Sequence, residues 1–220
     1  NAELSYFASA VDQLGNTYVM GTFSGTATFG VYSLSANGGK DNFLAKIDCG
    51  GSIVWVEKIG SSADEGDWGS VTVDKNNNIY VTGSHSNSCT FYSSNASNQT
   101  ISSAGGQDLY LAKYTPSGVL TWAINAGGGT GKENSFCVKT DNLNDVIITG
   151  YYGYNGVSCT FGGTSYSCAG VYDLFVEKFT PGGVFQWVRT AGSFGDDIGV
   201  AVEVDTNNTI YVTGQHWSTM

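Results

Sequence analysis

Residues Asn76–Gly83 read NNNIYVTG, and nearly the same stretch returns at Asn207–Gly214 as NNTIYVTG. Aligning the chain on this stretch gives four copies: AVDQLGNTYVMG, TVDKNNNIYVTG, KTDNLNDVIITG and EVDTNNTIYVTG. Their aspartates are separated by 62, 67 and 64 residues and are Asp12, Asp74, Asp141 and Asp205. The chain is therefore built on a repeat of a little over about 60 residues, the length of one supersecondary unit.

A second repeated stretch lies between successive copies of the first. It reads DNFLAKIDCGGSIVWVEKIG from Asp41, DLYLAKYTPSGVLTWAINAGG from Asp108 and DLFVEKFTPGGVFQWVRTAGS from Asp173. Both kinds of stretch contain two β-rich runs joined by a short turn, in which Gly and Asn tolerate positive φ. Each unit is therefore predicted to contain four antiparallel strands.

Four-stranded units at a fixed period predict an all-β fold, a β-propeller, because one twisted sheet must cover its faces by stacking on its neighbours. Trp55, Trp122 and Trp187 hold the same position in the fourth strand of three units, where a large ring can fill the gap between blades. We expect a single repeat domain over 1–220, with four-stranded antiparallel blades at 5–60, 68–126 and 134–192 and a half blade at 198–216.

These motifs resemble the bacterial β-propeller repeat of the SBBP type. Its members read GN-x-YVTG, then a segment with F-G, then a D-x-F-x-A-K hairpin with a Trp; the first unit here reads GNTYVMGTF, SGTATFG, DNFLAKI and IVWVEK. The third unit departs to NDVIITG, and the GN pair becomes NN or NT elsewhere. The resemblance implies a structural or binding module of extracellular or cell-surface proteins and does not imply one enzyme class.

The composition supports a folded domain and disfavours two kinds of partner. The 220 residues are 41% hydrophobic, which is enough to form a substantial core. The net charge is −10 with only nine Lys and Arg, so a nucleic-acid partner is not expected. The given sequence has no apolar run long enough to span a bilayer, and its first residues do not show the charged region and apolar stretch of a signal peptide, so membrane insertion is not expected.

The fourth unit contains only its first two strands, so about three and a half blades are present. A propeller needs typically four to eight blades to close its ring, and an open half blade presents an unpaired strand edge. We expect either the remainder of a longer chain or another copy to supply the missing strands. A fragment, or one subunit of an assembly, is favoured over a simple closed dimer.

The connections between second and third strands and the crossovers between blades fall on one variable face. These connections run about 20 residues, and long segments on a rigid scaffold often bind ligands. Asp64, Glu65 and Asp67 in a crossover are candidate Ca²⁺ ligands, although no Asp-x-Asp-x-Asp-Gly spacing is present and a solvated acidic rim is the favoured alternative. No other cofactor is expected.

Aromatic residues on the variable face suit carbohydrate rings. The candidates are Tyr151, Tyr152, Tyr154 and Trp217. His85 and His216 are added as candidate ligand residues, although matching positions hold Phe23 and Tyr152, which favours packing or a rim position. The repeated lysines are expected to pair with an acid or to span neighbouring blades; they are Lys46, Lys113 and Lys178.

The five cysteines include one candidate disulfide. Cys159 and Cys168 align with Ala27 and Ala36 of the first unit, which would face each other across a small hairpin, so a bridge is plausible. Cys89 lies opposite Ser103 in this alignment and lacks that partner. A zinc site is not expected because no Cys-x-x-Cys occurs.

No catalytic residue can be assigned, since no nucleophile elbow, carboxylate pair or phosphate loop is recognisable. The favoured function is a noncatalytic module for adhesion, scaffolding or assembly of filaments or oligomers. A carbohydrate-binding, lectin-like propeller is the alternative, and a polysaccharide-processing enzyme is a distant third.

Overall fold

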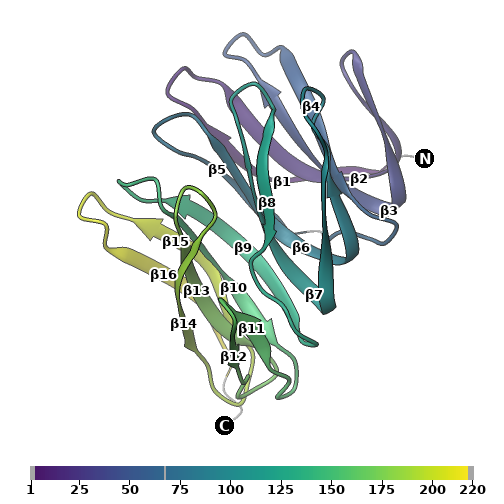
Figure 1. Cartoon of the computed structure of the whole chain (residues 1–220). Helices are drawn as coiled ribbons and strands as arrows, with labels where there is room; N and C mark the ends of the chain where they lie inside the picture. Colours follow the sequence, from purple (N-terminus) through teal and green to yellow (C-terminus); the bar gives the residue numbers. More distant parts are fainter. Residues whose placement is uncertain (1–2, 67, 218–220) are drawn as a thin grey trace.

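The computed structural model describes residues 3–66 and 68–217, and every regular element in this part is a β-strand (Figure 1). The first unit contains β1 (Leu4–Val11), β2 (Thr17–Phe29), β3 (Tyr32–Ile47) and β4 (Ile53–Gly60). The second contains β5 (Gly69–Val73), β6 (Ile79–Phe91), β7 (Gln99–Tyr114) and β8 (Leu120–Asn125). The described residues form no helix that could cross a membrane.

The third unit contains a small additional hairpin, and the fourth contains two strands. The third is formed by β9 (Lys132–Thr140), β10 (Val146–Gly153), β13 (Asp173–Phe179) and β14 (Phe185–Ala191), with β11 (Cys159–Phe161) and β12 (Thr164–Tyr166) as the additional hairpin. The fourth is formed by β15 (Asp197–Val204) and β16 (Ile210–His216). Within each unit, consecutive main strands pair antiparallel.

The units stand side by side in an open arc (Figure 1). Strand β5 packs between β1 and β9, and β15 packs on β9 and β10, so the first strands of the units line the inside of the arc. Short backbone pairings link neighbouring units: Ile59 pairs with Phe91, and Gln107 pairs with Lys132. This all-β arrangement is consistent with a β-propeller whose sheet is not closed.

The core lies between the units and consists of stacked aromatic and aliphatic side chains. Tyr18, Tyr110 and Phe91 are fully buried between the first two units. A second cluster, between the second and third units, contains Tyr80, Leu109, Phe161 and Phe175. A smaller cluster between the third and fourth units contains Ile147, Val176 and Val202. Burying such side chains is the main favourable contribution to folding, so each unit depends on its neighbours for stability.

The turn between the first two strands of each unit repeats one geometry. In the second unit, Asp74 Oδ1 accepts hydrogen bonds from the amides of Asn76 and Asn78, each at 2.8 Å. Asn77 adopts φ 61°, in the left-handed region that Asn and Gly tolerate. The corresponding positions are Gly15, Asn144 and Asn208, all with positive φ. The turn therefore explains why each unit repeats an Asp that accepts backbone hydrogen bonds and, three residues later, an Asn or Gly with positive φ.

The variable-face connections differ from the expected long loops. In the first unit, β2 and β3 continue as one long hairpin and leave only the two-residue turn Gly30-Val31. This turn pairs Phe29 with Tyr32, so Ala27 faces Leu34 and not Ala36. The sequence alignment missed the register by two residues because it did not start from the turn, which fixes the register of a hairpin.

Candidate functional site

Five aromatic side chains form a continuous stripe on the variable face, across the second and third units. We call Trp68, Phe136, Tyr151, Tyr172 and Tyr154 the aromatic stripe. Successive ring centroids lie 5.8, 5.7, 4.3 and 5.8 Å apart in this order. Trp68 and Tyr154, at the two ends, are the most exposed members, at 59% and 41%. The stripe brings together two of the three predicted tyrosines.

The alternation of side chains along β10 decides which tyrosine joins the stripe. Tyr151 pairs with Asn134 on one side and Leu174 on the other, and its ring reaches the stripe. Tyr152 follows directly and therefore points to the opposite face, where it is buried against Phe161 with burial raising its pKa to about 12. Tyr152 is thus a core residue, and its prediction as a ligand residue is wrong.

Polar groups border the stripe at the Tyr154 end. The Lys132 ammonium lies 5.0 Å from the centroid of the Tyr154 ring. Tyr172 forms a parallel backbone bridge with Asp196, which brings a carboxylate into the neighbourhood. Three members of the stripe were missed in the sequence: Trp68, Phe136 and Tyr172. Phe136 is the extra residue of a bulge in β9, where a side chain is often re-aimed, and this bulge is seen only in the strand register of the structure.

The two histidines and Trp217 have different environments. His85 is fully buried, its Nε2 lies 3.0 Å from Asn125 Oδ1, and burial lowers its pKa. It is a packing residue and does not reach a ligand surface. His216 is exposed and forms an ion pair with Asp197 when protonated, and Trp217 is 66% exposed. Both lie at the end of β16, where the Trp217 amide donates a hydrogen bond to the Asp196 carbonyl oxygen at 3.0 Å.

Two of the predicted Ca²⁺ ligands, Asp64 and Glu65, have different environments. Asp64 is exposed, and its Oδ1 accepts a hydrogen bond from the Lys40 amide at 2.9 Å. Glu65 is buried, which raises its pKa to about 8. Asp67 lies outside the described residues. In residues 3–66 and 68–217, no three His, Cys, Asp or Glu side chains are placed to hold a metal ion.

The predicted disulfide is absent from the structure: Cys159 and Cys168 are both free thiols. The two-residue turn Gly162-Gly163 pairs Cys159 with Tyr166, so Cys168 lies two residues beyond the opposing position. The alignment that placed these cysteines opposite each other carried the same two-residue register error as in the first unit. Burial raises the pKa of the Cys168 thiol, as expected for an unreactive core cysteine.

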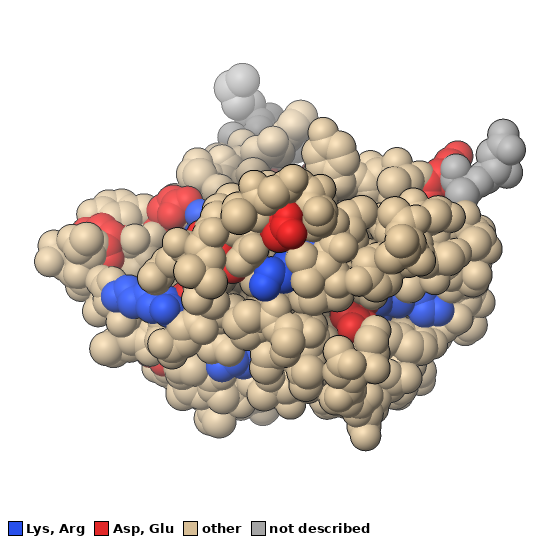
Figure 2. All heavy atoms as spheres, turned by 90° about the horizontal axis from the view of Figure 1, so that it is seen from above, with Lys and Arg blue, Asp and Glu red and all other residues tan. Residues whose placement is uncertain are grey.

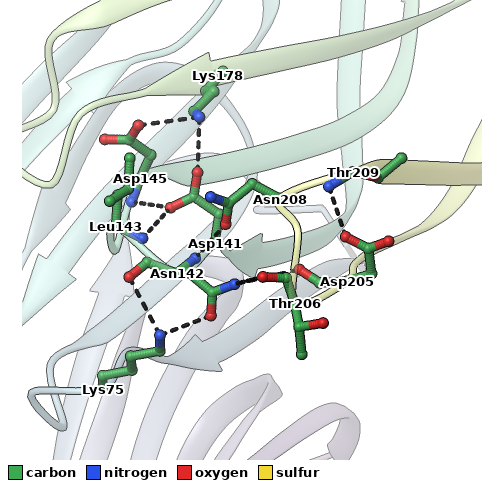
Figure 3. A network of polar contacts seen from close by, with 10 residues as sticks. All are labelled: Lys75, Asp141, Asn142, Leu143, Asp145, Lys178, Asp205, Thr206, Asn208 and Thr209. Carbon is green, nitrogen blue, oxygen red and sulfur yellow. Dashed lines mark hydrogen bonds and ion pairs between the residues drawn. The ribbon is translucent and has the colours of Figure 1, made fainter.

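The Asp-Asn turns converge on a cavity of about 220 Å³ at the inside of the arc. Figure 3 shows how neighbouring turns are joined there: the Lys75 ammonium binds the side-chain oxygen of Asn142 at 2.7 Å, and the Asn142 amide donates to Asn208 Oδ1 at 2.9 Å. Asp141 accepts from its own turn and pairs with Lys178 at 2.7 Å. These polar groups satisfy one another, so the cavity is a structural joint between units.

The outer side of β16 is the second candidate surface. Tyr211 is 58% exposed, whereas Tyr18 and Tyr80, at the same position of the first and second units, are fully buried. In those units a third strand covers the second strand. Among the described residues, β16 pairs only with β15 and therefore presents a free strand edge.

Comparison with known proteins supports the repeat architecture and identifies no function. The chain is 29% identical over 209 residues to a WD repeat-containing protein of Acanthamoeba polyphaga mimivirus. The alignment covers 85% of this chain and only 15% of that protein. No family model matches the chain. Fold and similarity together are consistent with a β-propeller-like repeat protein; the finer assignment to the SBBP type stays a prediction.

Proposed function

We propose that this chain is a noncatalytic propeller module that assembles through the free edge of β16, as part of an extracellular or cell-surface protein. Three and a half blades would be completed by another copy or by the remainder of a longer chain. The observation that carries the proposal is Tyr211, which is exposed at a position that is buried in two other units. An uncovered strand edge with an apolar surface favours pairing with another β-element.

Charge favours protein or glycan partners over nucleic acid. The net charge is −10, and Figure 2 shows a face on which isolated Lys and Arg side chains lie beside Asp and Glu within a mainly uncharged surface. Binding to a phosphate backbone draws its affinity from clustered basic side chains. Adhesion or scaffolding through strand pairing requires no such cluster.

Sedimentation analysis at increasing concentration tests assembly. Tyr211→Lys places a charge on the exposed edge and should shift the equilibrium toward the monomer, because inward or edge lysines oppose strand pairing. Val31→Lys, at an exposed hairpin tip, is the matched control and should leave assembly unchanged. A chain that stays monomeric at every concentration, and whose β16 amides bind no added β-hairpin, would contradict the proposal.

A lectin-like function is the second candidate, and the aromatic stripe favours it. Exposed aromatic rings beside a carboxylate and an ammonium group can stack on sugar rings and bind their hydroxyls. A glycan array should then show binding that is lost in Tyr154→Ala and retained in Val31→Ala. Equal binding by the wild-type chain and Tyr154→Ala, or no binding to any glycan, would argue against it.

A further inference from the structure

The first two units share an aromatic arrangement that spans three strands. In the first unit, the Lys46 ammonium lies 5.5 Å from the Tyr18 ring centroid, and the Trp55 ring lies 5.9 Å from it. The Tyr18 hydroxyl donates to Asp12. In the second unit, the corresponding residues are Tyr80, Lys113 and Trp122, with distances of 5.1 and 6.1 Å. A second-strand tyrosine is thus covered by a third-strand lysine and a fourth-strand tryptophan.

The same lysine and tryptophan also hold the next unit. Lys46 Nζ and Trp55 Nε1 both donate to the carbonyl oxygen of Pro116, at 3.0 and 3.2 Å. Gly118, two residues later in this turn, lies so close that a Cβ there would be 3.0 Å from the Trp55 ring. We call the contact of the Lys and Trp of one unit with the Pro-x-Gly turn of the next the clasp.

The lysine and glycine contacts of the clasp recur between the second and third units, where Trp122 Nε1 has no hydrogen-bond partner among the described residues. Lys113 Nζ donates to the carbonyl oxygen of Pro181 at 3.2 Å. Gly183 faces the Trp122 ring, where a Cβ would lie 3.3 Å from the ring atoms. Two clasps in one chain show that the sequence Thr-Pro-x-Gly is a docking element and also a turn.

The third unit carries the Lys and Trp of a clasp without the turn that they hold elsewhere. Lys178 pairs with Asp141 and Asp145, at 2.7 and 3.1 Å. Trp187 is half-buried, with the Arg189 guanidinium 5.6 Å from its ring. Within the described residues, no Pro-x-Gly turn follows the one that Lys113 holds. Lys178, with three N–H donors and two carboxylate partners, and Trp187 therefore form the lysine and tryptophan half of a third clasp.

The fourth unit carries the matching half of the aromatic arrangement. The Tyr211 hydroxyl donates to Asp205 at 3.2 Å, as Tyr18 and Tyr80 donate to Asp12 and Asp74. Tyr211 thus already holds the position that, in other units, receives a lysine and a tryptophan. The two vacant halves lie on neighbouring units that pack together through β13 and β15.

The register of the other units specifies how a third strand would pair with β16. Lys46 and Lys113 face Tyr18 and Tyr80 across the sheet. Asp41, Asp108 and Asp173, five residues before the corresponding lysines, face Phe23, His85 and Tyr152. On β16 these positions are Tyr211 and His216. An aspartate opposite His216 would also complement its charge when His216 is protonated.

We propose that β16, Tyr211, Lys178 and Trp187 form one recognition site for a β-hairpin that carries Asp-x4-Lys, a Pro-x-Gly turn and a following Trp. The first strand pairs antiparallel with β16, its Asp opposite His216 and its Lys on Tyr211. The turn carbonyl accepts hydrogen bonds from Lys178 and Trp187, and its Gly packs on the Trp187 ring. This inference rests on the proposed role of the β16 edge in assembly and specifies which partner the edge selects.

A peptide with the sequence of residues 108–125 is the probe, because it contains every feature of this hairpin. Binding to the full chain is measured by fluorescence anisotropy, and protection of residues 210–216 by hydrogen-exchange mass spectrometry. The matched peptide carries Val in place of the residue corresponding to Gly118, which requires positive φ and contact with an indole ring. As a second format, the same hairpin is fused to the chain through a Gly/Ser linker of about 15 residues, so that weak binding becomes intramolecular.

We expect the wild-type peptide to bind and protect residues 210–216, with affinity reduced about tenfold or more by the Gly→Val change and by Trp187→Leu. Tyr6→Ala, at an exposed site in the first unit, should have no effect. Protection of β16 that is insensitive to Gly→Val and Trp187→Leu would overturn this inference and leave assembly through the edge intact. The inference would also be overturned if the free peptide did not bind the chain and the fused hairpin did not raise its Tm. The proposed function is decided separately, by whether the chain assembles as its concentration rises.

Discussion

Trp55 in the first unit donates a hydrogen bond from Nε1 to the carbonyl oxygen of Pro116 in the second unit, at 3.2 Å. The donor and acceptor lie 61 residues apart, close to the length of one repeat. Because Lys46 binds the same oxygen, two side chains of one unit converge on one turn of the next. This contact therefore joins equivalent parts of two successive repeats and holds their sheets against each other.

The clasp predicts different effects of the same substitution at two equivalent turn positions. Gly118 and Gly51 both have positive φ, at 82° and 85°, so alanine strains the backbone at both. Only Gly118 contacts an indole ring; Gly51 has open space at the Cβ position. Gly118→Ala should therefore destabilise the chain by about 1–3 kcal/mol more than Gly51→Ala in urea unfolding. Equal losses would mean that the clasp does not contribute to stability.

The buried aspartate of the second unit should be required for stability. Asp74 is 3% exposed and accepts from two backbone amides, from the Asn78 side chain and from the Tyr80 hydroxyl. Asp74→Ala leaves these donors unpaired and should cost about 2–4 kcal/mol of unfolding free energy. Asp205→Ala, in the equivalent but exposed turn, should cost clearly less. A larger loss of unfolding free energy in Asp205→Ala than in Asp74→Ala would show that burial of the aspartate does not determine its contribution to stability.

Glu133 should make stability depend on pH. Burial raises its pKa to about 8, and the nearby Asp108 carboxylate acts in the same direction, whereas the ordinary value is 4.5. Between these values the folded state binds more protons than the unfolded state, so stability falls as pH rises. The neutral Glu133→Gln variant should lack this fall and gain about 1–4 kcal/mol relative to wild type across the window.

The control for this pH dependence is Glu203→Gln, on a largely exposed side chain paired with Lys139. Other buried carboxyls remain in every variant, so the quantity to compare is the difference between two curves of unfolding free energy against pH. Curves for wild type and Glu133→Gln that stay parallel from pH 4.5 to pH 8 would show that Glu133 binds no extra proton in the folded chain.

The free thiols predict that reductant has no effect on stability. Cys159 and Cys168 are unbridged, so the Tm should be the same with and without dithiothreitol. Cys49 is exposed and should be alkylated first under native conditions. If the Tm fell on reduction, and the non-reduced peptide containing residues 159–168 were two mass units lighter than the reduced one, the disulfide predicted from the sequence would be correct.

The sequence was sufficient for the features that depend on the repeat. Four equivalent Asp turns, the positive-φ Asn77 and the tryptophan between units all follow from one aligned period. Lys46 and Lys178 illustrate the two roles expected for the repeated lysine, since the first spans two units and the second pairs with acids. These features are local or occur in several units, and a local pattern that recurs at a fixed period is stronger evidence for a fold than a single occurrence.

The candidate site was only partly predictable because it depends on contacts between units. The period-two alternation along β10 could have separated Tyr151 from Tyr152, since adjacent residues of a strand face opposite sides. The approach of Tyr172 to Tyr151, at 4.3 Å, joins segments whose spacing no motif records. The exposure of Tyr211 requires knowing which strands cover β16, which is a property of the assembled sheet.

The central claim is that stacked four-stranded units bury their second strands, while β16 stays uncovered. Hydrogen exchange of the monomeric chain, at a concentration where sedimentation shows a single chain, compares β6 with β16 directly. Residues 79–85 should be strongly protected and residues 210–216 should exchange much faster, although the two sequences are nearly identical. Equal protection of both segments in the monomer would contradict the account.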